Sequence, residues 1–137
     1  MKNILIVSNS DTCRSRMAQE ILNSFGRGMR ISTAGVLVGN SVPDVVCLVM
    51  EQNGYDFSRR KPCDVATYAQ QTWDYVITLC PEAEEVQKEM QGVVRKYVSF
   101  NFADPFRGGI HADDEQEERV VALYDAMHKE LYEFFRS

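Results

Sequence analysis

The 137-residue sequence contains few of the residues from which metal sites are built. It has two histidines, and its four cysteines (Cys13, Cys47, Cys63 and Cys80) are far apart, with no Cys-x-x-Cys pair. A zinc site needs clustered ligands, so we expect no metal, and we expect no cofactor either. In a reducing compartment these cysteines should remain free thiols.

Positive charge and long apolar runs are also scarce. The chain has 15 Lys and Arg against 20 Asp and Glu, and its longest basic run is Arg59-Arg60-Lys61. Because nucleic-acid binding depends on dense basic patches, nucleic acid is not an expected partner. The apolar run Ile4–Val7 is too short for a signal-peptide core or a membrane span. We therefore expect a cytoplasmic protein with no membrane partner.

The chain does have a regular alternation of short apolar runs and amphipathic segments. Its length and its 45% hydrophobic content suffice for a single domain over residues 1–137 with a proper core. Strands that alternate with helices favour parallel pairing and right-handed crossovers, and hence a three-layer α/β sandwich. The expected strands are 2–7, 30–33, 75–79 and 96–100, and the expected helices are 15–25, 43–53, 64–71, 81–90 and 115–135.

Candidate site residues follow three of these strands. Ser8 and Cys80 come directly after a strand, and Asp104 lies in the loop 101–114 after the last one. Ligands of parallel sheets bind beyond the carboxyl ends of the strands. We therefore expect all three side chains to face one crevice.

The loop from Ser8 to Ser15 carries the strongest functional signal. It joins a strand to a helix, where backbone N–H groups and the helix N-terminus attract an anion. The planar guanidinium of Arg14 can bind two oxygens of a tetrahedral anion. Five residues separate Ser8 from Arg14, which lets the loop wrap around an oxyanion with side chain 8 beneath its central atom. A cysteine at position 8 would make this the Cys-x5-Arg cradle of a phosphatase.

The segment VSNSDTCRSRMA resembles the signature of the low-molecular-weight protein tyrosine phosphatases, Val-Cys-x-Gly-Asn-x-Cys-Arg-Ser-Pro-Met-Ala, with Ser8 in place of the catalytic cysteine. STAG at residues 32–35 and ADP at residues 103–105 also match the family's pattern. The resemblance spans nearly the whole chain and implies a four-stranded parallel sheet flanked by helices. The family includes thioredoxin-linked arsenate reductases, whose version of the strand end is similar to VITLC at residues 76–80.

The resemblance implies a role for each matching residue. Ser8 stands at the nucleophile's position, and Ser15 would hydrogen-bond the nucleophile and favour its anion. Arg14 would bind equatorial oxygens and stabilise transition-state charge. Asp104 would protonate the leaving group and then activate water. Cys13 matches a loop cysteine that can protect an oxidised nucleophile as a disulfide. Substrate contacts are implied for Asn9, Ser10, Asp11, Thr12, Cys13 and Phe106.

Ser8 is the largest departure from the family's pattern. A thiol has a pKa near about 8.5, which such a loop can lower to roughly 3.5–7.5. A serine hydroxyl is far less acidic, and the sequence shows no general base beside it. We therefore expect the chain to bind an oxyanion but scarcely to turn it over. Ser8 is either an engineered replacement of cysteine or the mark of a natural pseudo-enzyme, and the retention of Arg14, Ser15 and Asp104 favours the former.

Two further departures lie in or next to the same loop. Ser10-Asp11 replaces Gly-Asn, and Asp tolerates left-handed backbone geometry nearly as well as Asn. We expect the Asp11 side chain to point away from the anion and to cap the following helix. Arg16 replaces proline, on what we expect to be an exposed first helical turn, and would add to the positive field.

Three functions remain open at this point. Phe106 would form an aromatic wall for a phenyl ring, which favours hydrolysis of phosphotyrosine or aryl phosphates through a cysteinyl-phosphate intermediate. Cys80 stands where the reductases keep a second redox cysteine, so the alternative is arsenate reduction with thioredoxin or another thiol reductant, although their third cysteine is missing near Gln87. The third function is non-catalytic binding of phosphotyrosine or another oxyanion. SNSDTC also resembles the flavin-phosphate loop of flavodoxin-like proteins, which would leave Arg14 unexplained.

Overall fold

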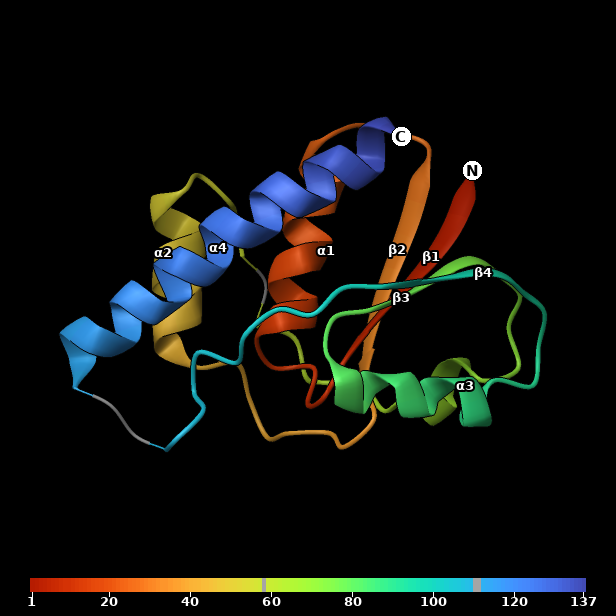
Figure 1. The fold of residues 1–137 in the computed structure, drawn as a ribbon, viewed down its shortest axis with the longest axis horizontal. Helices are drawn as coiled ribbons and strands as arrows, with labels where there is room; N and C mark the ends of the chain where they lie inside the picture. The colour runs from red at the N-terminus through yellow and green to blue at the C-terminus, as the bar shows by residue number, and fades with distance from the viewer. Residues whose placement is uncertain (58, 110–111) are drawn as a thin grey trace.

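The computed structural model describes residues 1–57, 59–109 and 112–137. Within these residues four strands form one parallel sheet in the order β2-β1-β3-β4, with helical segments on both faces (Figure 1). The expected three-layer α/β sandwich is therefore confirmed. The strands are β1 (Lys2–Ser8), β2 (Met29–Gly35), β3 (Trp73–Thr78) and β4 (Val94–Ser99); the helices are α1 (Arg14–Ser24), α2 (Asp44–Gln52), α3 (Val86–Glu89) and α4 (Asp113–Arg136), with 3-10 segments η1 (Val65–Tyr68) and η2 (Pro81–Glu85).

Strand β1 lies at the centre of the sheet. It pairs with β2 along its whole length, and its Ile4–Val7 segment pairs with β3 on the other side. Both faces of this segment are covered, which explains why it reads as a continuous apolar run. The chain leaves β1 toward β2 on one side and later returns to β3 on the other. The carboxyl end of β1 is thus the switch point at which such sheets bind ligands.

The side chains of β1 alternate between two hydrophobic cores. Ile4 and Ile6 join the core beneath α1, α2 and α4, whereas Leu5 and Val7 join the core beneath η1, η2 and α3. Helix α4 packs against both α1 and α2. This packing holds the start of α1 firmly against the end of β1.

The expected elements are present, but two of the expected helices are shorter and tighter. The segment expected as a helix over 81–90 is η2 followed by a single turn of α3, and the one over 64–71 is η1 alone. Ala83 and Val86, the buried residues of this segment, are three positions apart, a spacing that suits the three-residue repeat of a 3-10 helix. Residues 110 and 111 of the expected loop 101–114 lie outside the described residues.

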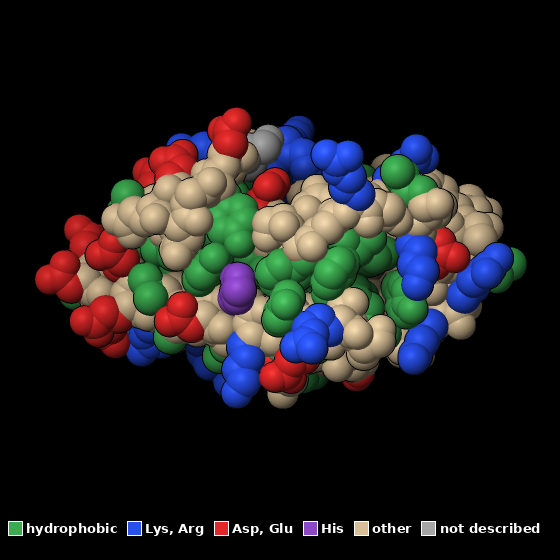
Figure 2. All heavy atoms as spheres, turned by 90° about the horizontal axis from the view of Figure 1, so that it is seen from above, with side chains coloured by type: hydrophobic (Ala, Val, Ile, Leu, Met, Phe, Trp, Pro, Cys, Tyr) green, Lys and Arg blue, Asp and Glu red, His purple; other side chains and the backbone are tan. Residues whose placement is uncertain are grey.

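Helix α4 is amphipathic and begins with three acidic residues, Asp113, Asp114 and Glu115. Negative charge at this end suits the helix dipole. Figure 2 shows acidic side chains gathered at the end of the molecule where α4 begins. Among the described helices, none combines the length and the apolar character that a membrane crossing requires.

Gly35, the last residue of β2, lies against the loop that follows β1. A Cβ atom at this position would lie 2.7 Å from the carbonyl carbon of Ser10 and 2.9 Å from both the carbonyl oxygen of Asn9 and the amide nitrogen of Asp11. All three are backbone atoms, which cannot swing aside as a flexible side chain would. The glycine of the STAG segment therefore lets the end of β2 approach the loop closely.

We expect Gly35→Ala to lower the free energy of unfolding by about 1–3 kcal/mol, because the added methyl group overpacks a backbone contact. Gly26→Ala is the matched control. The atoms nearest to its Cβ would belong to the ring of Phe135, at 2.8 Å, and that side chain is 37% exposed, so its far end can shift more easily than backbone. Equilibrium urea unfolding of the two variants checks the difference, and equal losses would contradict the assigned contact.

Candidate active site

The loop after β1 is held in place by the segment that follows β2. Three successive carbonyl groups, those of residues 8–10, accept hydrogen bonds from backbone N–H groups of residues 36–39. The pairs are Val36 to Ser8, Leu37 to Asn9 and Gly39 to Ser10, with N···O distances of 3.2, 2.8 and 2.9 Å. The carbonyl side of the loop is therefore turned toward the 36–39 segment.

The same hydrogen bonds determine where the N–H groups of the loop point. In a trans peptide the C=O and the following N–H point in opposite directions, and the described residues contain no cis peptide bond. The N–H groups of Asn9, Ser10 and Asp11 therefore face away from the 36–39 segment, and the Asp11 nitrogen lies 3.3 Å from Ser8 Oγ. Asp11 has a φ of 58°, the left-handed geometry that the sequence allowed. Such a concave row of N–H groups attracts an anion.

The concave side of this loop faces a cavity of about 180 Å³. The cavity brings Ser8 and Arg14 of this loop together with Asp104 and Phe106, which lie far along the sequence. Arg14 is nearly buried, and its Nη1 donates to the carbonyl oxygen of Phe102 at 2.9 Å, which fixes the guanidinium at the rim. The lining residues are Ser8, Asn9, Ser10, Thr12, Cys13, Arg14, Pro43, Asp104 and Phe106.

Asp104 and Phe106 reach the cavity from the loop after β4. The Phe106 N–H donates to Asp104 Oδ1 at 2.9 Å, so the carboxylate is oriented by its own turn. Buried Gln116 of α4 anchors this turn, because its Nε2 donates to the carbonyl oxygen of Pro105 at 2.6 Å. Sequence reasoning missed Gln116, since nothing in an acidic helix start indicates which side chain turns inward.

Two larger hollows adjoin the cavity. One of about 520 Å³ also contains Arg14 and Asp104 and adds the guanidinium groups of Arg107 and Arg119. The other, of about 670 Å³, lies beyond Phe106 between the starts of α2 and α4. Both hollows therefore extend the space that opens from the loop after β1.

A chain of hydrogen bonds leads from Ser8 into the protein. Ser8 Oγ donates to Ser15 Oγ at 2.8 Å, and Ser15 Oγ donates to Asp11 Oδ1 at 2.7 Å. All three residues are at most 2% exposed. The hydrogen bond expected between Ser15 and position 8 is present, with Ser8 as the donor.

The expectation that Asp11 caps helix α1 is wrong. Cys13 occupies the N-cap position, and no side chain caps this helix. The two carboxylate oxygens of Asp11 accept instead from the Ser15 hydroxyl and, at 2.9 Å, from the backbone N–H of Cys63. The left-handed turn at Asp11 aims the side chain into the protein, away from the cavity and off the helix axis.

The expectation that Arg16 is exposed is also wrong, because its exposed fraction is 2%. Its Nη1 donates to the carbonyl oxygen of Arg60 at 2.7 Å. Burial lowers the pKa of Arg16 and the charge of Arg60 lowers it further, while the carboxylate of Asp11 opposes both effects. Asp11 and Arg16 thus place opposite charges near each other beneath the loop.

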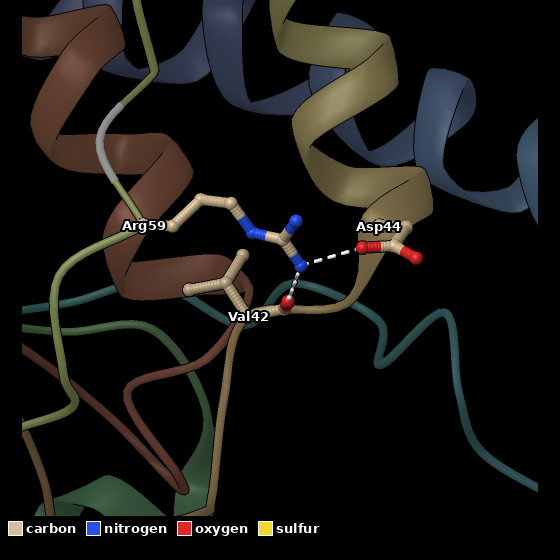
Figure 3. A network of polar contacts seen from close by, with 3 residues as sticks. All are labelled: Val42, Asp44 and Arg59. Atoms are coloured by element: carbon tan, nitrogen blue, oxygen red, sulfur yellow. Dashed lines mark hydrogen bonds and ion pairs between the residues drawn. The ribbon is translucent and has the colours of Figure 1, made fainter.

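Pro43 forms a wall of the cavity, and Arg59 fixes the segment that carries it. Arg59 Nη2 donates to the carbonyl oxygen of Val42 at 3.1 Å and to Asp44 Oδ1 (Figure 3). The ion pair is exposed and therefore contributes little to stability. Its effect is positional, because it holds both neighbours of Pro43 at the entrance to α2.

The four cysteines are free thiols, and the two with a candidate redox role, Cys13 and Cys80, are buried. Cys13 lines the cavity, but burial raises the pKa of its thiol to about 12, with Arg14 opposing and Asp104 reinforcing the shift. Cys80 is 1% exposed and packs with Val7 in the core beneath η2, and burial raises its thiol pKa as well. Of the three expected strand-end residues, Ser8 and Asp104 share the cavity and Cys80 does not line it.

Known proteins similar to this chain include both phosphatases and arsenate reductases. A glutaredoxin arsenate reductase from Synechocystis sp. is 29% identical over 80 residues, which are 58% of this chain and 61% of that protein. The structure of a low molecular weight protein tyrosine phosphatase from T. tengcongensis has a TM-score of 0.81 at 16% identity, over 99% of both chains. An arsenate reductase in the phosphate binding state has a TM-score of 0.74 at 20% identity, over 99% of this chain and 98% of the other. The two structures share the fold of this chain.

Residues 3–134 match the family model described as low molecular weight phosphotyrosine protein phosphatase. This span includes almost all of the sheet, the loop after β1 and the turn that carries Asp104. The resemblance found in the sequence is therefore confirmed over nearly the whole chain. The chain belongs to the low molecular weight phosphotyrosine protein phosphatase family.

Proposed function

We propose that this protein binds the phosphoryl group of an aryl phosphate or phosphotyrosine at the loop after β1. The site is arranged for phosphoryl transfer to the side chain of residue 8, and serine at that position makes hydrolysis slow. The single observation that carries the proposal is the convergence of inward-facing loop amides, Arg14 and Asp104 on a cavity with Ser8 in its lining.

Binding follows from the charges and dipoles around this cavity. A phosphate dianion would accept from the N–H groups of residues 9–11, and the start of α1 adds the positive end of a helix dipole. Arg14 would bind two oxygens with its planar fork. Phe106 lies among the lining residues, where a phenyl ring could pack against it.

The reaction would proceed by displacement at phosphorus. Side chain 8 would attack, and the leaving oxygen would depart on the side of Asp104, which would supply its proton as a general acid. Arg14 and the loop amides would stabilise the charge on the equatorial oxygens. In a second step Asp104 would take a proton from the attacking water and free the site.

Replacing Ser8 by Cys should raise the rate of p-nitrophenyl phosphate hydrolysis well above that of the Ser8 protein, because a thiolate is a far better nucleophile and leaving group. Adding Asp104→Asn to the Ser8→Cys protein should lower kcat by roughly 10²–10⁴-fold, since general acid catalysis contributes about that much. Steady-state kinetics measures both effects. If Ser8→Cys gives no gain and the Ser8 protein does not bind phosphate, the site does not perform this chemistry.

Binding can be separated from turnover in the Ser8 protein itself. Arg14→Met should weaken the protein's affinity for inorganic phosphate about 10- to 100-fold. Hydrogen bonds to charged groups contribute about 1.5–3 kcal/mol, and a loss of that size changes a dissociation constant by about this factor. Arg95→Met is the matched control, because Arg95 is exposed on β4 and pairs with Asp74 at the opposite end of the sheet. Isothermal titration with phosphate checks both variants, and an equal loss in both would remove Arg14 from the binding site.

Arsenate reduction is the second candidate, favoured by Cys80 at the end of β3 and by the similarity to a glutaredoxin arsenate reductase. In that function a thiol at position 8 would take up arsenate, and a second thiol would form a disulfide with it. The burial of Cys80 and its place outside the cavity favour the phosphatase instead.

We expect Cys80→Ser, introduced into the Ser8→Cys protein, to leave p-nitrophenyl phosphate hydrolysis within about threefold, because Cys80 is a packing residue in this proposal. The same pair of proteins is then assayed for arsenate reduction with thioredoxin and with glutaredoxin. Arsenate reduction that depends on Cys80 would identify the protein as a reductase.

A further inference from the structure

Two of the positions at which the chain departs from its family's loop are joined by hydrogen bonds. Ser8, in place of the catalytic cysteine, is linked through Ser15 to Asp11, which stands in place of asparagine. Both distances, 2.8 and 2.7 Å, are those of good O–H···O hydrogen bonds. A carboxylate therefore lies one hydroxyl group away from the residue at the nucleophile's position.

The Asp11 carboxylate determines which atom donates in each of these two hydrogen bonds. An ionised carboxyl group only accepts, so Ser15 must turn its proton toward Asp11 and is left to accept from Ser8. The Ser8 proton therefore points into the protein, away from the cavity. An asparagine at position 11 could donate its amide protons to Ser15, and Ser15 would then be free to donate to a thiolate at position 8.

Ser15 thus has one proton for two possible acceptors. A thiolate at position 8 and a carboxylate at position 11 would compete for this proton. A hydroxyl at position 8 does not compete, because it donates its own proton to Ser15. Asp11 suits a serine at position 8 and disfavours the anionic cysteine of the family.

We propose that Ser8, Ser15 and Asp11 form a proton relay, and that this relay makes the Ser8 hydroxyl an acceptor of phosphoryl groups. The proposal rests on the phosphoryl-binding function argued above. It assigns to Asp11 a positioning and proton-accepting role that acts on the substrate only through Ser15 and Ser8.

The atoms of this step balance as follows. Ser8 Oγ forms a bond to phosphorus while the bond from phosphorus to the ester oxygen breaks. The Ser8 proton moves to Ser15 Oγ as the Ser15 proton moves to Asp11 Oδ1. The leaving oxygen departs as a phenolate or takes the proton of Asp104. The products are the phenol or phenolate and a phosphoserine at position 8.

A carboxylate is a sufficient proton acceptor for such a transfer. Phosphoryl transfer passes through a loose transition state that demands little of the nucleophile, and protein kinases phosphorylate serine hydroxyls with an Asp as the proton acceptor. The positive charge of Arg16 lies close to Asp11 and partly balances the charge that the carboxylate brings beneath the loop. Ser8 Oγ also accepts the Asp11 N–H at 3.3 Å, which orients the oxygen.

The return step regenerates the serine. Water attacks phosphorus, its proton passes to Asp104, and the Ser8 oxygen leaves and recovers its proton from Asp11 through Ser15. A serine oxygen is a poorer leaving group than a thiolate, so this half of the cycle is slow. The phosphoserine should therefore accumulate, and nitrophenolate release should show a burst that approaches one equivalent per protein.

The test combines p-nitrophenyl phosphate, rapid quenching and mass spectrometry of the peptide that contains Ser8. The unaltered protein should carry phosphate on Ser8, and Ser8→Ala should carry none on this peptide. Asp11→Asn should slow the phosphorylation roughly 100-fold, because it removes the proton acceptor. Asparagine is nearly isosteric, tolerates the left-handed φ of 58° and can still accept from the Cys63 N–H. Ser15→Ala breaks the relay while residue 11 remains Asp, and it should slow the reaction similarly.

A second measurement asks whether Asp11 raises or lowers the pKa of a thiol at position 8. It does not depend on enzymatic activity. In the Ser8→Cys protein, Asp11→Asn should lower the pKa of the new thiol, measured as the pH dependence of its reaction with iodoacetamide. Arg14 of α1 and Asp104 of the loop after β4 are the other charged groups at the cavity, and Arg16 lies beneath it. They are identical in both proteins, so the difference isolates position 11. In the proposed relay Asp11 promotes the reaction of a serine at position 8 and hinders ionisation of a cysteine there. A purely structural role of Asp11 would not produce these opposite effects.

The outcomes separate this inference from the proposed function. If the protein does not bind phosphate and the Ser8→Cys protein does not hydrolyse p-nitrophenyl phosphate, both the proposed function and the relay are wrong. A protein that binds phosphate but never phosphorylates Ser8 would overturn the relay alone. Equal phosphorylation rates for the unaltered protein and Asp11→Asn would overturn it as well, as would equal thiol pKa values in the second measurement.

Discussion

Three backbone hydrogen bonds between the loop after β1 and the segment after β2 are the constraint on which the site depends. They turn the carbonyl groups of residues 8–10 to one side and, because the peptides are trans, the following N–H groups to the other. Gly35 permits the contact, since any side chain there would meet the loop backbone. The anion-binding character of the loop is therefore a property of how β2 ends, as much as of the loop's own residues.

Ser15 gives this general scaffold its particular chemistry. Its single hydroxyl proton can stabilise an anion at position 8 or satisfy the carboxylate at position 11, and in this chain it does the second. Burial makes the choice consequential, because Asp11 and Ser15 are shielded from solvent and the carboxylate has no water to replace the Ser15 proton. The residues at positions 8 and 11 are thus coupled, and substitutions there should not act independently.

The sequence predicted those features of the site that depend on contiguous residues. It did not predict side-chain orientations that depend on backbone groups from distant segments. The loop from Ser8 to Arg14 is contiguous, and the sheet order places its end where ligands bind, so these residues and Asp104 could be brought together from pattern alone. The burial of Arg16 could not, because it requires a carbonyl group from Arg60, 44 positions away. The orientation of Asp11 likewise depends on the N–H of Cys63, and no local pattern reports that contact.

The docking of residues 36–39 on the loop also couples the site to folding. The converging N–H groups exist only when both segments are in place, so the unfolded chain offers an oxyanion no comparable site. A ligand that binds the native state alone raises its stability by mass action, by about 2.7 kcal/mol at a concentration 100 times the dissociation constant. With the proposed phosphoryl-binding function, phosphate and sulfate in a buffer would raise the melting temperature of this protein, and its stability would be defined only together with the anion composition of the solution.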